Sequence, residues 1–302
     1  MHQSHAPTIQ ERFFHFLRWV FPPAKRFLPP EMHEHHDHTH PIHPPWYQEQ
    51  PRLWNYLAAR TEFVLLQIID KITNIVPKVI IKRIVAPLIG MPIQMPVHQV
   101  VPIEVLNRLI DDYEIHHIPI WIGLCPCRRA LTKYSDEPIR NFTDIVFGDW
   151  GKEYSKVLPQ CFKQISYATC RSLFAKFDQM GLVHTLYAFC GTGTMQAVVC
   201  NCDSSVCVPL HFYKTTGVRS FTNSPFELNY NPTKCIGCQQ CISKCQSNAR
   251  KWNPTTQKID ISKEWCIGCG SCREVCSQKA NFLVRNPNQP LVVAPPCYLN
   301  EK

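Results

Sequence analysis

Eight cysteines near the C-terminal end of the sequence stand in two groups with the same internal spacing. The first group lies in KCIGCQQCISKCQSNAR, which begins at Lys234, and the second lies in WCIGCGSCREVCSQKAN, which begins at Trp265. Each cysteine of the first group recurs 31 positions later, together with the Ile-Gly pair that follows the first cysteine. We interpret this as an internal duplication. Thiolates at this density and spacing are typical of iron–sulfur clusters, whose chemistry is the transfer of single electrons.

Each group has the spacing CxxCxxCxxxC, in which three thiolates bind one cluster and the fourth binds the cluster of the other repeat. This predicts two [4Fe-4S] clusters: cluster one with Cys235, Cys238, Cys241 and Cys276, and cluster two with Cys266, Cys269, Cys272 and Cys245. Gly237 and Gly268 suit these loops because glycine tolerates positive φ and lets backbone N–H groups approach sulfur. Structural zinc is disfavoured because a third cysteine so close to a CxxC pair exceeds a tetrahedral site. Disulfides are disfavoured because no secretory signal is seen.

The stretch from about Asn231 to Leu283 resembles the bacterial two-cluster [4Fe-4S] ferredoxin module. The resemblance implies a compact domain that relays single electrons. The sequence departs from it at Gln246 and Ser277, where such ferredoxins usually carry proline after the fourth cysteine. Loss of proline returns a backbone N–H donor beside each fourth thiolate. Between the repeats, NPTTQKIDI predicts a turn followed by a short strand at 258–261.

Net charge and cysteine content indicate which partners and which cellular compartment to expect. The formal net charge is +9, and two clusters at about −2 each would bring it to about +5. No helix-turn-helix, RNA-recognition or zinc-finger pattern accompanies this charge, so we expect no nucleic-acid partner. Seventeen cysteines without a secretory signal lead us to expect a reducing, anaerobic cytoplasm.

The segment 98–222 is a second cysteine-rich region. Apolar periodicity predicts helices over 100–113 and 167–180 and strands over 117–124 and 182–189, so we expect a cysteine-rich α/β domain. Its motifs HQVVPIEVL, CPCRRA, GLVH and CNC resemble the domain that precedes a two-cluster ferredoxin module in uncharacterised 4Fe-4S binding proteins of anaerobes. The last motif is often a denser cysteine run in that family, whereas here residues 203–206 interrupt it before Cys207.

That resemblance implies a third metal centre, either an iron–sulfur cluster or zinc. The ligands we expect are Cys125, Cys127, Cys200 and either Cys202 or Cys207, and Cys161 is a further candidate. Arg128 and Arg129 would lie beside these thiolates and lower their pKa. Buried apolar cysteine is the alternative interpretation, and it suits Cys170 better than it suits two CxC pairs.

The N-terminal 97 residues contain no cysteine. Residues 1–52 form a His- and Pro-rich arm whose histidine tract either binds a divalent metal or is simply a polar tract, the interpretation we favour. Within the arm, the aromatic and basic stretch Phe13–Phe21 predicts a docking segment. Residues 53–97 predict an amphipathic helical region with Lys71, Lys78 and Lys82 on one face, suited either to protein packing or to a membrane surface.

The whole chain is therefore expected to be α+β, with a helical N-terminal segment, the domain 98–222, a two-cluster ferredoxin domain at 223–284 and a tail at 285–302. The favoured function is an iron–sulfur electron-transfer protein, docked as a subunit of a larger anaerobic redox complex, with redox proteins as partners. We expect it in the cytoplasm, at the cytoplasmic face of the membrane if the N-terminal region attaches there. The alternative is a reductase whose third metal centre is open to substrate. No catalytic residue and no nucleotide-binding signature is identified.

Overall fold

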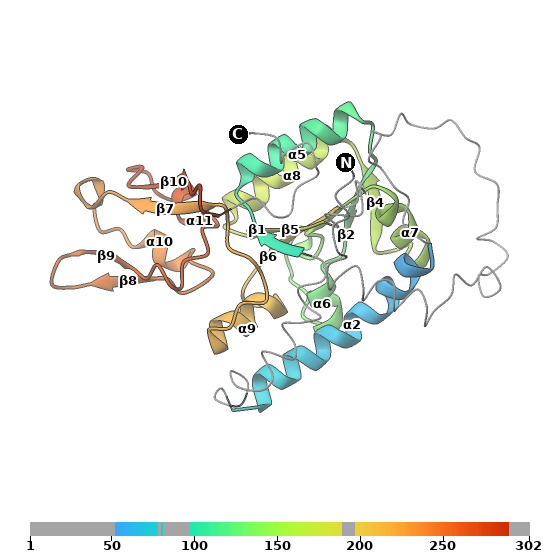
Figure 1. The fold of residues 1–302 in the computed structure, drawn as a ribbon, viewed down its shortest axis with the longest axis horizontal. Coiled ribbons are helices and arrows are strands. Elements are labelled where there is room, and N and C mark those ends of the chain that lie inside the picture. Colours follow the sequence, from blue (N-terminus) through green and yellow to red (C-terminus); the bar gives the residue numbers. More distant parts are fainter. Residues whose placement is uncertain (1–51, 78–79, 81–96, 189–196, 290–302) are drawn as a thin grey trace, which may run out of the picture.

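The structure is a computed structural model that describes residues 52–77, 80, 97–188 and 197–289 (Figure 1). The His-rich arm, the Phe13–Phe21 stretch, Lys78 and Lys82 lie outside these residues. The described chain mixes helices and strands, which confirms the α+β expectation at this level. Within the described residues, no helix is both long enough and apolar enough to cross a membrane.

A six-stranded sheet forms the centre of the middle domain. The strands are β1 (Val97–Val100), β2 (Ile120–Gly123), β3 (Asp144–Phe147), β4 (Phe162–Ile165), β5 (Val183–Ala188) and β6 (Ala197–Cys202). Their order across the sheet is β1-β5-β6-β3-β2-β4, and every neighbouring pair is antiparallel. The expected α/β arrangement is therefore wrong for this domain, because that class is built on parallel strands joined by crossover helices.

One face of the sheet is covered by α5 (Ile103–Ile115) and α8 (Tyr167–Gln179), which lie side by side in Figure 1. Helix α5 buries apolar side chains at helical spacing: Val105, Leu106, Leu109, Ile110 and Tyr113. Helix α8 is capped by Ser166, the residue before it, whose hydroxyl accepts a hydrogen bond from the Thr169 N–H, and the helix contributes Phe174 and Phe177 to the core. Both helices and the strand at 183–188 were predicted from the sequence.

The other side of the sheet faces α6 (Pro126–Leu131), α7 (Asp149–Val157) and α9 (Val208–Thr216), and α2 (Arg52–Ile75) packs across these three helices. Trp150 of α7 packs on Val146 and Val198 of the sheet. Helix α2 packs against α6, α7 and α9, and its buried Ile69 contacts the same cluster as Val208 and Phe212. The helical region expected over 53–97 contains this helix, one face of which packs on protein, whereas 78–79 and 81–96 lie outside the described residues.

The ferredoxin-like part is closed by β7 (Phe226–Tyr230), which pairs with β10 (Asn281–Arg285). Between them, β8 (Arg250–Asn253) and β9 (Lys258–Ile261) form the hairpin that joins the two repeats, as predicted. Each repeat has one short helix, α10 (Gln240–Ser243) or α11 (Ser271–Glu274), and each helix follows a residue with positive φ. The duplication in the sequence is thus repeated in the backbone.

This part packs directly on the middle domain. The Gln246 side chain accepts a hydrogen bond from the Ser204 N–H at 3.0 Å and donates one to the Gly181 carbonyl oxygen at 3.1 Å. The Lys244 ammonium donates to the Met180 carbonyl at 3.3 Å. The Ser224 N–H donates to the Ile267 carbonyl oxygen at 3.1 Å. The first three bonds fasten the first repeat to the middle domain, and the last one links the second repeat to the segment just after that domain.

Candidate functional site

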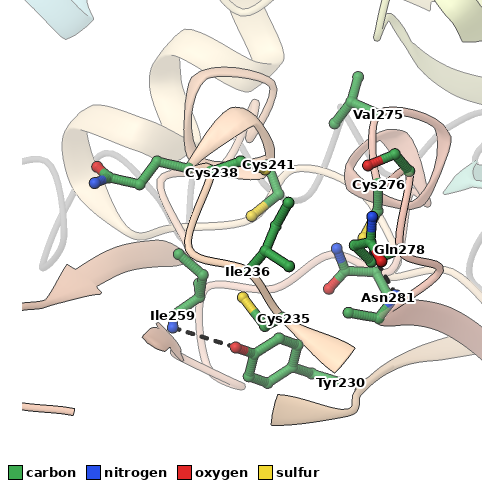
Figure 2. Close-up of a pocket in the computed structure, with 13 residues that line it drawn as sticks. Tyr230, Cys235, Ile236, Cys238, Cys241, Ile259, Val275, Cys276, Gln278 and Asn281 are labelled. Carbon is green, nitrogen blue, oxygen red and sulfur yellow. Dashed lines mark hydrogen bonds between the residues drawn. The ribbon is translucent and has the colours of Figure 1, made fainter. Parts of the chain in front are cut away.

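Two cavities in the ferredoxin-like part are lined by cysteines. The outer cavity encloses about 360 Å³, including its open mouth, and is lined by cysteine, apolar and amide side chains (Figure 2). Its cysteines are Cys235, Cys238, Cys241 and Cys276. In Figure 2, Cys235 and Cys241 come from the first repeat, whereas Cys276 approaches from the second. Tyr230 closes the floor, and its hydroxyl accepts a hydrogen bond from the Ile259 N–H at 3.4 Å.

The second cavity, which we call the inner cavity, takes up about 320 Å³ including its open mouth and is lined by the remaining four cysteines of the duplication: Cys245, Cys266, Cys269 and Cys272. Three of them belong to the second repeat, and Cys245 belongs to the first. Each cavity therefore brings together three thiols of one repeat and the last thiol of the other, the grouping that the crossed ligand pattern requires. Cluster binding by these two sets stays a prediction.

Backbone N–H groups point at the sulfurs in the same way in both repeats. The Ala249 N–H donates to the Cys245 sulfur at 3.3 Å, and the Ala280 N–H donates to the Cys276 sulfur at 3.2 Å. The Gly237 N–H donates to the Cys235 sulfur at 3.4 Å from a backbone with φ +72°. Such donors stabilise thiolate ligands. They explain why alanine and glycine recur with the cysteines in the duplication.

Arg250 provides positive charge between the two sets of cysteines. It is buried, its Nη2 donates to Asn281 Oδ1 at 2.8 Å, and its Nη1 is buried without a hydrogen-bond partner within the described part of the chain. Burial lowers the pKa of Arg250, but Cys272 and Cys241 outweigh that effect and raise it. A buried guanidinium N–H with no acceptor is suited to a neighbouring anionic iron–sulfur cluster. Arg250 and the cysteines around it therefore suit the [4Fe-4S] clusters that the cysteine spacing predicts. No motif in the sequence indicated this role of Arg250.

Burial makes several of these thiols poor acids while they are free. It raises the pKa of Cys269 to about 11 and also raises the pKa of Cys272 and of Cys266. Metal binding requires thiolates, so loading a cluster would release these protons. The described residues contain no group of three or more His, Cys, Asp or Glu side chains arranged to hold one metal ion. In a [4Fe-4S] cluster each thiolate binds a different iron, so these ligands do not converge on one point.

A second group of cysteines lies in the middle domain, and we call it the five-thiol group: Cys125, Cys127, Cys200, Cys202 and Cys207. Cys125 and Cys207 are the residues that cap the N-termini of α6 and α9, whereas the CNC motif belongs to β6. The two CxC motifs therefore come together, but Cys200 lies inside a strand rather than at its end.

The thiols of this group contact one another in a chain. The Cys125 and Cys207 thiols hydrogen-bond to the Cys127 sulfur, and these bonds hold the pKa of Cys127 well below its ordinary value. Cys207 also hydrogen-bonds to Cys202. The Val208 N–H approaches the Cys127 sulfur at 3.5 Å. Three separate segments of the chain thus place their sulfurs side by side.

Polar groups border the five-thiol group. Asp144 pairs with Cys200 across β3 and β6, and the Cys200 thiol donates to Asp144 Oδ1 at 3.1 Å. Burial raises the pKa of Asp144 to about 7. Arg128 lies near Cys127, as the sequence indicated, and also pairs with Asp203 at 3.6 Å. Asp144 was not identified from the sequence, because only the register of β3 against β6 places it beside a thiol.

Two other cysteines have different surroundings. The Cys161 carbonyl oxygen accepts a hydrogen bond from the Leu124 N–H at 2.8 Å, and the thiol contacts described above do not involve Cys161. Cys170 is fully buried in the apolar core beneath α5 and α8, where burial raises its pKa to about 12. The apolar interpretation of Cys170 agrees with this position. The third metal centre stays a prediction.

Comparison with known proteins identifies one part of the chain. Residues 234–280 match the model of the 4Fe-4S dicluster domain family. This stretch contains all eight cysteines that line the two cavities and leaves the middle domain unmatched. No curated protein matches the chain.

Proposed function

We propose that the protein relays single electrons through two [4Fe-4S] clusters, each held by the four cysteines of one cavity. The observation that carries this proposal is the grouping of three thiols from one repeat with the fourth thiol of the other, within the stretch that matches the dicluster family. A bound [4Fe-4S] cluster takes up or gives off one electron at a time. The chain's own residues hold the clusters, donate N–H groups to their thiolates and place Arg250 between them.

The crossed assignment is tested by comparing Cys245→Ala with Cys276→Ala. Anaerobically prepared protein should contain about eight iron and eight sulfide per chain. Cys245→Ala should disturb the paramagnetic signal of the inner cluster, and Cys276→Ala that of the outer cluster. Cys161→Ala serves as the control and should leave both signals unchanged. If each substitution damaged the cluster of its own repeat, the crossed assignment would be refuted.

We further propose that the chain works as a docked subunit of a larger anaerobic redox complex, at the cytoplasmic face of the membrane or on a redox protein. The support comes from α2, whose outer side leaves Leu65, Ile68 and Ile75 with 49%, 49% and 77% of their surface exposed. Exposed apolar side chains on a helix are typical of contact surfaces. Lys71, also exposed, adds a positive charge.

Substitution of Leu65 and Ile68 by glutamine tests this docking, since both changes keep the helix and remove the apolar surface. The variant should retain about eight iron yet no longer purify with its partner or bind vesicles. Deleting the whole segment would be a poorer test, because α2 also covers Val208 and Phe212. Native protein that purifies alone and does not bind vesicles would refute the subunit proposal.

A reductase with a third metal centre is the second candidate. The observation in its favour is that five cysteines from three segments meet in the middle domain. The reductase candidate predicts iron or zinc in addition to that of the two clusters, and this extra metal should be lost in Cys127→Ala. The spectrum of the extra metal should change when substrate is added. Metal content limited to about eight iron would exclude it.

A further inference from the structure

The five-thiol group lies directly behind the inner cavity. Cys202 and Cys207 share one buried apolar cluster with Ile267, and Cys269 and Trp265 pack against the same cluster. Ile267 and Cys269 also line the inner cavity. The inner cavity and the thiols of the middle domain therefore border the same apolar cluster, whereas the outer cavity lies among β9, α10 and the end of the second repeat.

Cys207 is the centre of the chain of thiols. It hydrogen-bonds to Cys127 on one side and to Cys202 on the other. The Cys202 thiol also contacts the Thr185 hydroxyl at 3.4 Å, and the Cys200 thiol donates to Asp144. The Cys127 sulfur lies beside the Cys125 and Cys207 thiols and 3.5 Å from the Val208 N–H, the first amide of α9. Cys127 and Cys207 are thus neighbouring thiols from two different segments of the chain.

This geometry suits sulfur–sulfur chemistry better than a single metal ion. Within the described ranges, no three of these side chains are arranged to hold one ion. Thiols that hydrogen-bond to one another are also closer together than cubane ligands, each of which binds a separate iron. Two such neighbouring cysteines form a disulfide when they lose two protons and two electrons.

We propose that Cys127 and Cys207 form a dithiol–disulfide pair that exchanges two electrons with the two clusters. In the reducing direction, the Cys127–Cys207 bond breaks, each reduced cluster gives one electron, and two protons from solvent complete the two thiols. The reverse reaction returns two electrons and two protons. The stoichiometry is matched, since two one-electron clusters together hold the two electrons that one disulfide takes up. This inference rests on the proposed electron relay.

Burial explains why electrons would reach this pair through the clusters. Cys127 and Cys207 have 7% and 5% of their surface exposed. Thiol–disulfide exchange needs direct access of an attacking thiolate to sulfur, which such burial prevents. The pair would therefore be insulated from the soluble thiols of a reducing compartment and would respond to the redox state of the inner cluster.

The test counts electrons and thiols in full-length protein loaded with iron and sulfide under anaerobic conditions. Reductive titration should consume about four electrons per chain in the native protein and about two in Cys207→Ala. After acid quenching and alkylation, the reduced native sample should show two more free thiols than the oxidised one. In the oxidised sample the link should join the tryptic peptides 109–128 and 177–214, and it should disappear both in Cys127→Ala and in Cys207→Ala. Cys170→Ala, another buried cysteine, should behave as the native protein does.

The outcomes separate the inference from the proposed relay. About eight iron with no difference in thiol count, or a disulfide between any other pair, would overturn the Cys127–Cys207 proposal and leave the relay intact. Iron or zinc beyond the two clusters that is lost in Cys207→Ala would overturn it in favour of a metal centre. Fewer than four iron would refute the relay and this inference together. The thiol count on native protein needs no variant, so poor folding of one substitution leaves the test valid.

Discussion

Replacing Gln246 by alanine removes two hydrogen bonds that fasten the first repeat to the middle domain. The lost bonds are the one from the Ser204 N–H at 3.0 Å and the one to the Gly181 carbonyl at 3.1 Å. Each is worth about 1 kcal/mol net, so opening this contact should become easier by about 2 kcal/mol. Since 1.4 kcal/mol is a factor of ten, hydrogen exchange of the Ser204 amide should accelerate about 30-fold.

Hydrogen exchange followed by mass spectrometry on the holo protein measures this directly, because the Ser204 amide is itself one of the donors. Ser277 is the matched control: it occupies the same position of the second repeat and is exposed. Ser277→Ala should leave exchange at residues 203–207 within about twofold of native. Unchanged exchange in Gln246→Ala, or equal acceleration in both variants, would refute the role of Gln246 as an anchor.

Two further predictions concern substitutions of buried residues. Burial lowers the pKa of His98, which stacks on Tyr187, to about 3, so the unfolded chain takes up a proton below pH 6.5 that the folded chain does not. Stability should therefore fall as pH falls from 6.5 toward 3, by about 2 kcal/mol at pH 5, and denaturant unfolding of His98→Leu should show less of this loss. Gly268 has φ +69°, and an added Cβ would lie 2.2 Å from the Phe226 carbonyl oxygen. Gly268→Ala should retain only about four iron, whereas Gly237→Ala, whose Cβ meets a movable Trp252 side chain at 3.1 Å, should retain about eight on iron analysis.

The sequence predicted the local features because they depend on local patterns. The helix that begins at Arg52, the helices α5 and α8 and the hairpin strand β9 follow from apolar periodicity and turn residues. The grouping of cysteines into two cavities follows from spacing alone, since the repeat itself carries that information. These features needed no knowledge of which strands pair.

The long-range features could not be predicted in this way. Strands of four to six residues carry too little pattern to reveal their partners, so the antiparallel order of the sheet was missed. The position of Asp144 opposite Cys200 depends on that order, and so does the approach of Cys207 to Cys127. The sequence named the right thiols of the five-thiol group but not their contacts, and it kept Cys161 in reserve without a signal for or against it.

Two features noted in the sequence meet in space. Gln246 stands where two-cluster ferredoxins usually have proline, and residues 203–206 separate the CNC motif of the middle domain from Cys207. In the structure the Gln246 side chain binds the Ser204 N–H within that segment. Proline has no side-chain amide and could make neither bond of Gln246. Without Gln246 the Ser204 amide would lose this acceptor, so residue 246 and the segment 203–206 form one contact that holds the inner cavity against the five-thiol group.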